Sequence, residues 1–318
     1  MTKVYLAATL VAATILASCK KDPVLEINFC RELEDLDIGY SVYPEDTMYF
    51  APCFNPNNNS EFVYIEKTYE PEYGSRLCKY NLLTNEKSYL SDNIDFNPKW
   101  TSKDWIIFNR YNSQIWKIKS NGDSLTPLFT TGTNYYCEIS PAGDKIIFKN
   151  QVDNYLKLVL SDMEANILDS IPYETFTSGS WSKDGLKITS RKINFPSSFG
   201  YYDTLLSHFT DIISSPYNSP VDEIEDTEWF NDSNSILWLG NNKYHVINIE
   251  TKETYIFSEV CENIYNLYPS FSPDGLNIIW EKNEKEVLNG GSKLNWKAKI
   301  IMTDINGKNE QIILPRTN

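Results

Sequence analysis

Three basic residues stand at recurring positions where a ligand could reach them. Arg110, Lys149 and Arg191 each fall at or just after the end of a short apolar segment that the sequence predicts as a β-strand. Guanidinium and ammonium groups donate charge-assisted hydrogen bonds to carboxylates and other oxygen-rich ligands. If these strands belong to neighbouring units of one fold, the three cations would surround a common opening.

Aromatic side chains and one carboxylate complete this candidate ligand-binding set. Tyr136, Phe195 and Tyr268 are expected around the same opening, and Glu281 begins the last long loop on that side. Such a mouth suits a peptide, a carboxylate or a glycan, because large amphipathic rings bury area while charged groups fix orientation. The alternative is a set of unrelated loop residues beside aromatic rings that only pack the fold.

Catalytic chemistry has little material to use in this sequence. The two histidines, His208 and His245, fall in predicted outer strands without a metal-ligating partner at useful spacing, so structural or surface roles are favoured. A His-based triad, a His-rich metal centre, a Gly-x-Ser-x-Gly elbow and a phosphate-binding glycine loop find no match. The 43 acidic residues leave an acid–base pair of carboxylates open, so catalytic residues stay unassigned. Neither a metal nor a cofactor is expected.

A repeated hairpin supplies the elements that position these residues. The segment "FSPDGLNIIW" aligns with "WSKDGLKITS", "ISPAGDKIIF", "WFNDSNSILW", the shorter "WTSKDWIIF" and the weaker "FNPNNNSEFVY". The large residues that open the six copies are the structural anchors Phe54, Trp100, Ile139, Trp181, Trp229 and Phe271. Their spacing of 39 to 48 residues is typical of a β-propeller blade.

Each repeat predicts four short strands, which we letter a to d from the inside outwards. Strand a ends at the anchor, a polar turn leads to a β-branched strand b, and strands c and d follow. Four short strands cannot bury a face alone, so neighbouring units must stack, with the anchors filling the gaps between them. The sequence therefore predicts an all-β fold, a six-bladed β-propeller of four-stranded antiparallel blades.

The last repeat resembles a known family. "PSFSPDGLNIIW" and "KIIMTDINGK" look like the WD-like repeat of TolB-type propellers, and the resemblance covers about residues 48 to 314. It departs from the pattern in the first repeat, where Asn57-Asn58-Asn59 replaces Asp-Gly. The resemblance implies the fold and says little about function, because the family includes periplasmic binding and scaffold proteins, propellers that gate serine peptidases, and some polysaccharide lyases.

The aspartates of the a–b turns are interpreted as structural. Asp184, Asp232 and Asp274 lie on separate blades and cannot converge on one ion, so they are expected to accept hydrogen bonds from nearby turn amides. The opposite face carries the b–c loops, which are expected to be long at 66–76, 191–203 and 281–296. Long loops gathered on one face of a rigid scaffold usually carry binding, so the ligand site is expected there.

The N-terminus is typical of a bacterial lipoprotein. A basic start and a short apolar run precede "LASC", which ends at Cys19 and resembles the lipobox. The resemblance implies cleavage before Cys19 and a diacylglycerol on its thiol, with acyl chains such as palmitate in the membrane. The expected organisation is a signal peptide at 1–18, a tether from the lipidated Cys19 at 19–40, and a propeller at 41–318.

The other cysteines are interpreted mainly as small buried thiols, while a disulfide among them is left open. They are Cys30, Cys53, Cys78, Cys137 and Cys261. The net charge of −14 makes nucleic acid an unexpected partner.

Three functions follow, of which a purely structural member of an envelope complex is the third. The first is a lipid-anchored lipoprotein of the cell envelope, expected in the outer membrane, whose propeller binds a protein or glycan ligand without catalysis. The alternative is a carbohydrate-active enzyme, a polysaccharide lyase or glycoside hydrolase that uses carboxylates in the central cleft. Whether the protein faces the periplasm or the cell surface is left open.

Overall fold

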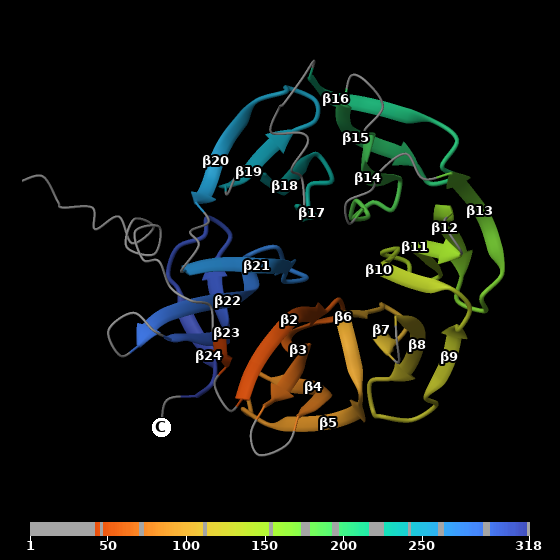
Figure 1. Ribbon diagram of the computed structural model, residues 1–318. Helices are drawn as coiled ribbons and strands as arrows, with labels where there is room; N and C mark the ends of the chain where they lie inside the picture. Colours follow the sequence, from red (N-terminus) through yellow and green to blue (C-terminus); the bar gives the residue numbers. More distant parts are fainter. Residues whose placement is uncertain are drawn as a thin grey trace, which may run out of the picture.

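The six-bladed β-propeller predicted from the repeats is confirmed (Figure 1). The computed structural model describes residues 42–44, 47–69, 73–110, 113–152, 155–172, 179–192, 197–215, 226–240, 243–259, 264–288 and 293–316. Every element in these ranges is a β-strand. Cys19, the signal peptide and the tether lie outside the described residues.

The strands of each blade follow one another in the chain. Blade 1 consists of β2 (Thr47–Asn55), β3 (Asn58–Thr68), β4 (Gly74–Asn81) and β5 (Lys87–Asp92). Blade 2 consists of β6 (Ile94–Trp100), β7 (Trp105–Arg110), β8 (Gln114–Lys119) and β9 (Thr126–Phe129). Blade 3 consists of β10 (Thr133–Ile139), β11 (Lys145–Val152), β12 (Tyr155–Asp162) and β13 (Ile167–Pro172). Blade 4 consists of β14 (Lys187–Lys192), β15 (Ser197–Asp203) and β16 (Phe209–Ser215). Blade 5 consists of β17 (Thr227–Trp229), β18 (Ser235–Gly240), β19 (Lys243–Asn248) and β20 (Thr254–Glu259). Blade 6 consists of β21 (Ile264–Phe271), β22 (Asn277–Leu288), β23 (Lys293–Asp304) and β24 (Gln311–Leu314).

Two blades depart from the predicted four antiparallel strands. The described part of blade 4 has three strands, and its innermost segment is represented by a single antiparallel bridge between Trp181 and Ile188. Blade 6 carries an additional strand, β1 (Val42–Pro44), which pairs in parallel with the beginning of β23. The N-terminal part of the propeller is therefore attached to its last blade.

The anchors pack between the blades. Six buried apolar clusters join neighbouring blades, and each contains one anchor packed against the preceding blade. Five anchors are at most 6% exposed, while Ile139 is half-buried. Trp229 is fully buried, and its indole N–H donates a hydrogen bond of 3.1 Å to the carbonyl oxygen of Ser180 in blade 4.

A bulge recurs in the innermost strands, three residues before the anchor. Ala51, Asn97, Tyr136 and Tyr268 have positive φ angles of 31° to 50°. The pairing with strand b shifts register across each of these positions. A bulge bends a strand and re-aims its side chains. The residue just before the anchor is thereby directed towards the centre of the ring in blades 1, 2, 3 and 6, where it lines a cavity.

The turn aspartates act as the sequence predicts. Asp184, Asp232 and Asp274 accept hydrogen bonds of 2.8 to 3.0 Å from amides two or three residues later. Side chains also join the turns of neighbouring blades. These bonds are Asn57 to Ser102, Ser102 to Pro141, Asp184 to Ser233, Asn231 to Pro273, and the reciprocal pair of Asn59 and Asp274. The last pair closes the ring between blades 6 and 1.

We expect Asp274→Ala to lower the free energy of unfolding by about 1–2 kcal/mol, because Leu276 and Asn59 both lose a charged acceptor. A double-mutant cycle with Asn59→Ala, followed by urea denaturation, should give a coupling of about 0.5–1 kcal/mol. Asp304→Ala is the matched control, since Asp304 caps its own turn through Asn306 and Lys308. If Asn59→Ala coupled to Asp304→Ala as strongly as to Asp274→Ala, the pair of Asn59 and Asp274 would not have the ring-closing role.

The segments predicted as long b–c loops are mostly strand. Pairing of β3 with β4 continues to Thr68 and Gly74, and pairing of β22 with β23 continues to Leu288 and Lys293. The loop prediction is therefore wrong over most of these segments, because their polar residues occupy paired strand positions, several of which are buried, such as Glu66 and Glu281. Blade 6 consequently extends into a hairpin longer than those of its neighbours (Figure 1).

Candidate functional site

A cavity of about 540 Å³ opens where the six blades meet on the face of the a–b turns. Its lining comes from all six blades, and we call it the channel mouth. The residues are Cys53, Phe54, Pro56, Asn57, Lys99, Trp100, Ser102, Glu138 to Pro141, Trp181, Lys183, Glu228, Asn231 and Pro269 to Pro273. This face is opposite to the one on which the sequence analysis places the ligand.

One repeat position supplies the polar interior of the channel mouth. The residue that directly precedes the anchor is Cys53, Lys99, Glu138, Glu228 and Ser270 in five of the blades, and all five line the cavity. Strand a places its anchor between blades, so successive side chains alternate and this neighbour faces the channel. The packing role of the anchor therefore also positions the polar residue beside it.

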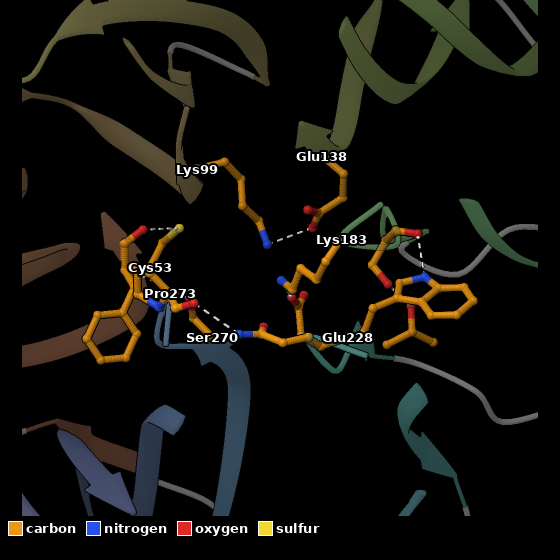
Figure 2. Close-up of polar contacts among 12 residues, drawn as sticks. Cys53, Lys99, Glu138, Lys183, Glu228, Ser270 and Pro273 are labelled. Carbon is orange, nitrogen blue, oxygen red and sulfur yellow. Dashed lines mark hydrogen bonds and ion pairs between the residues drawn. The ribbon is translucent and has the colours of Figure 1, made fainter. Parts of the chain in front are cut away.

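Two ion pairs lie across blade boundaries in the channel mouth. Lys99 Nζ of blade 2 is 2.7 Å from Glu138 Oε1 of blade 3. Lys183 Nζ of blade 4 is 2.7 Å from Glu228 Oε1 of blade 5. Figure 2 shows that the four side chains converge from separate strands and turns. The mouth therefore presents two cations and two carboxylates although the chain as a whole carries a charge of −14.

Burial governs the electrostatics of these pairs. Desolvation raises the pKa of the Glu138 carboxyl to about 7; Lys99 opposes this effect and Glu228 adds to it. Desolvation alone would lower the pKa of the Lys99 ammonium, but the neighbouring carboxylates outweigh it and the pKa is raised. Lys99 thus stays charged at neutral pH, whereas Glu138 exchanges its proton near neutrality.

Apolar surfaces flank the charged centre. The anchors Phe54, Trp100, Trp181 and Phe271 contribute to the wall. The indole nitrogens of Trp100 and Trp181 have no hydrogen-bond partner among the described residues, unlike that of Trp229. Paired charges between aromatic walls can bind a ligand that carries apolar groups and groups of both charges.

Three residues of the sequence-predicted set come together elsewhere. Lys149 Nζ lies 4.6 Å from the centroid of the Tyr136 ring, a cation–π distance. Burial lowers the pKa of the Lys149 ammonium to about 8, and the charge of Arg191 adds to the effect. Tyr136, Lys149 and Arg191 therefore form one cluster on blades 3 and 4, at the channel end opposite to the a–b turns.

Arg110 does not share the position of Lys149 and Arg191. The turn of blade 2 is one residue shorter, so Asn109 occupies the equivalent register, three residues beyond the partner of the anchor. The Arg110 guanidinium lies over the Trp116 ring at 5.3 Å. Phe195 lies outside the described residues.

Glu281 and Tyr268 lie at a different place, between blades 6 and 1. Glu281 is 3% exposed and accepts hydrogen bonds from the Ala51 amide at 2.9 Å and the Asn283 amide group at 2.7 Å. Burial raises the pKa of the Glu281 carboxyl to about 7 against these hydrogen bonds and the charge of Lys67. Glu281 is therefore a buried inter-blade group rather than the start of an exposed loop.

Sequence reasoning missed Lys99, Glu138, Lys183 and Glu228. Three of them stand immediately before an anchor, so a column of the repeat alignment one position upstream would have identified them. Their pairing could not be read from that column, because the distance between side chains on different blades depends on closure of the ring.

The remaining sequence predictions concern cysteine, histidine and the membrane. Cys53, Cys78 and Cys137 are free thiols within strands, whereas Cys30 and Cys261 lie outside the described residues. His245 stacks on Trp238 in blade 5, with ring centroids 4.3 Å apart. In the part of the chain that the structure covers, no three His, Cys, Asp or Glu side chains are grouped to hold a metal ion. Within the same ranges, no helix is long and apolar enough to cross a membrane.

Comparisons with known proteins give the fold. No family model and no curated protein matches the chain. Among solved structures, TolB from Acinetobacter baumannii has a TM-score of 0.57 and 13% identity, over 82% of this chain and 61% of that one. A putative TolB from Agrobacterium tumefaciens has a TM-score of 0.56 and 12% identity, over 74% of this chain and 86% of that one. The β-propeller domain of the Trilobed protease from Pyrococcus furiosus has a TM-score of 0.55 and 11% identity, over 86% of this chain and 100% of that one. The chain thus spans about three fifths of the Acinetobacter protein, and the likeness establishes a TolB-type propeller fold.

Proposed function

We propose that this TolB-type propeller is a cell-envelope lipoprotein whose channel mouth binds a segment of a partner protein. The observation that carries the proposal is the cavity itself, which is lined by all six blades and holds two ion pairs beside aromatic walls. Binding sites are usually concave and apolar, with a few convergent polar groups. The likeness to TolB structures supports a binding propeller, and the lipobox supports the envelope location.

A polypeptide suits this cavity because its side chains offer both charges and apolar groups. An acidic side chain can engage Lys99 or Lys183, and a basic one can engage Glu138 or Glu228, each by a charge-assisted hydrogen bond. Apolar side chains can pack on Trp100 and the neighbouring prolines of the wall. The two salt bridges keep the charged groups in place before the partner arrives, which lowers the ordering cost of binding.

A charge swap tests the proposal without removing the ion pair. In the variant Lys99→Glu/Glu138→Lys, the pair is retained while the pattern of charge facing the ligand is reversed. We expect the immobilised wild-type protein to capture at least one envelope protein and the swap to lose it, with thermal stability close to wild type. Equal capture by both proteins, or capture of none, would contradict binding at the channel mouth.

The lipid anchor has its own test. Cys19→Ala removes the thiol that the lipobox resemblance assigns to the diacylglycerol, so the protein should move from the membrane fraction to the soluble fraction of the envelope. Immunoblotting of the two fractions measures this shift, with Cys53→Ala as the matched cysteine control. Retention of Cys19→Ala in the membrane fraction would argue against lipidation.

One observation favours the enzymatic alternative. Glu138 and Glu228 line the same cavity, and a carboxyl with a pKa of about 7 is suited to act as a general acid. Both carboxylates are engaged in salt bridges with lysines at 2.7 Å, which favours a binding role. Turnover of an envelope polysaccharide by the wild type, abolished in Glu138→Gln, would establish the enzyme instead.

A further inference from the structure

A second cavity, of about 270 Å³, lies mainly between blades 6 and 1, with Asn97 of blade 2 also in its lining, and we call it the inter-blade pocket. It belongs to the ends of the strands away from the a–b turns, on the opposite side of the ring from the channel mouth. Its lining is Phe50, Ala51, Ile65, Lys67, Asn97, Tyr265, Leu267, Tyr268, Glu281, Asn283 and Trp296. The proposed protein-binding site uses none of these residues.

A continuous chain of hydrogen bonds fixes the polar wall of the inter-blade pocket. The Trp296 indole N–H donates to Asn283 Oδ1 at 2.8 Å, and Asn283 Nδ2 donates to Glu281 Oε1 at 2.7 Å. The second oxygen of Glu281 accepts the amide of the bulge residue Ala51 at 2.9 Å. Glu281 and Asn283 are 3% and 1% exposed. A connected network of this kind, buried at Glu281 and Asn283, holds its members rigidly.

Aromatic rings form much of the remaining wall, together with the aliphatic side chains of Ile65 and Leu267. The rings of Phe50 and Trp296 meet edge to face with centroids 6.0 Å apart. Tyr268 is 36% exposed and sits at the bulge, where its φ of 49° departs from extended strand geometry. Lys67 Nζ lies 5.2 Å from the centroid of the Phe50 ring. The pocket thus combines aromatic rings with a buried carboxylate, an amide and an ammonium.

We propose that the inter-blade pocket binds a neutral sugar residue of a glycan. The C–H face of a pyranose ring stacks on aromatic rings, while its hydroxyls both donate and accept hydrogen bonds. Among the described residues, each carboxylate oxygen of Glu281 accepts one hydrogen bond, and each has capacity for a second, which a sugar hydroxyl can donate. Lys67 lines the same cavity and can donate to a hydroxyl oxygen.

Two other occupants fit less well. An apolar side chain would cover Glu281 and Asn283 without offering hydrogen bonds, and burial of polar groups without compensation is costly. A basic side chain would meet Lys67, whose ammonium already lies beside the aromatic wall and within the field of Glu281. A neutral, hydroxyl-rich ring satisfies the polar groups and avoids this repulsion.

Saturation-transfer NMR on the purified protein tests the pocket. The probes are a panel of neutral monosaccharides, n-butylammonium and isobutanol. Each is used at about 10 mM, because a Kd in the millimolar range is expected for one small site. We expect transfer to the ring protons of at least one sugar and none to the other two probes. Trp296→Leu should weaken sugar binding at least tenfold. Tyr268→Leu removes an exposed ring and should weaken it several-fold in a folded protein.

The channel-mouth swap Lys99→Glu/Glu138→Lys is the matched control and should bind the sugar as the wild type does. The proposal would be overturned if the wild type gave no sugar signal, or if n-butylammonium or isobutanol gave a signal instead. It would also be overturned if both pocket variants bound the sugar as strongly as the wild type does. Loss of protein capture by the swap does not depend on this result, so the two proposals can fail separately.

Discussion

Trp229→Ala is expected to lower the free energy of unfolding by about 3–5 kcal/mol, the cost of deleting a large buried aromatic side chain. Trp229 is fully buried and packs in the cluster that joins blades 4 and 5. Its indole N–H also donates to the carbonyl of Ser180, which keeps the Thr189 amide as a second donor, so most of the cost comes from lost packing. Since each anchor joins two blades, we expect Trp181→Ala, at the boundary of blades 3 and 4, to fall in the same range.

Two further variants separate packing from hydrogen bonding. Trp229→Phe keeps a six-membered ring but loses the pyrrole edge and its N–H donor, so it should cost about 1–2 kcal/mol, less than Trp229→Ala. Tyr255→Ala removes an aromatic ring that is 57% exposed on an outer strand and should change stability by less than about 0.5 kcal/mol. Urea denaturation measures all of them. If Trp229→Ala resembled Tyr255→Ala, the anchors would not be the inter-blade packing units.

Lys99→Met is expected to lower the free energy of unfolding by about 3–5 kcal/mol at pH 8, because it leaves the largely buried Glu138 carboxylate without its partner. The loss should be smaller at pH 6. Glu138 has a folded pKa of about 7, above its unfolded value, so its contribution to stability is complete below about pH 4.5 and is lost as pH rises. Without Lys99 the folded pKa rises further, and protonation relieves the unpaired charge at acidic pH.

Urea denaturation at pH 6 and pH 8 measures this dependence. Adding Glu138→Gln to Lys99→Met should recover most of the stability at pH 8, because neither charge of this ion pair remains. Lys243→Met is the matched control: its partner Glu259 is at 3.1 Å, but the two side chains are 38% and 65% exposed, so little change is expected. A loss for Lys99→Met that is equal at both pH values would show that Glu138 does not govern it.

The fold could be predicted from the sequence because the same physical demand recurs in every blade. A large anchor must fill each inter-blade gap and a tight turn must follow it, so both leave a repeated pattern of Trp or Phe before Ser, Pro, Asp and Gly. The parallel pairing of β1 with β23 leaves no such pattern. Three residues that join a strand edge are indistinguishable from a linker in sequence.

The candidate site could be predicted only in part. Lys149 and Tyr136 do meet, since both lie at fixed positions of the same repeat. Arg110 was displaced by a turn that is one residue shorter, which moves its side chain to the other side of its strand. The channel mouth was missed because its charged residues stand beside anchors, and the pairing of Lys99 with Glu138 arises only when the ring brings separate blades together.

Photo-crosslinking in cells measures partner binding at the channel mouth directly. A photoreactive amino acid in place of Asn231, an exposed residue at the rim, should crosslink a discrete envelope protein, and the Lys99→Glu/Glu138→Lys swap should abolish the adduct. The same probe in place of Tyr255 on the outer strand of blade 5 should give no such adduct. An adduct from Tyr255 but not from Asn231, or one that survives the swap, would contradict a protein-binding channel mouth.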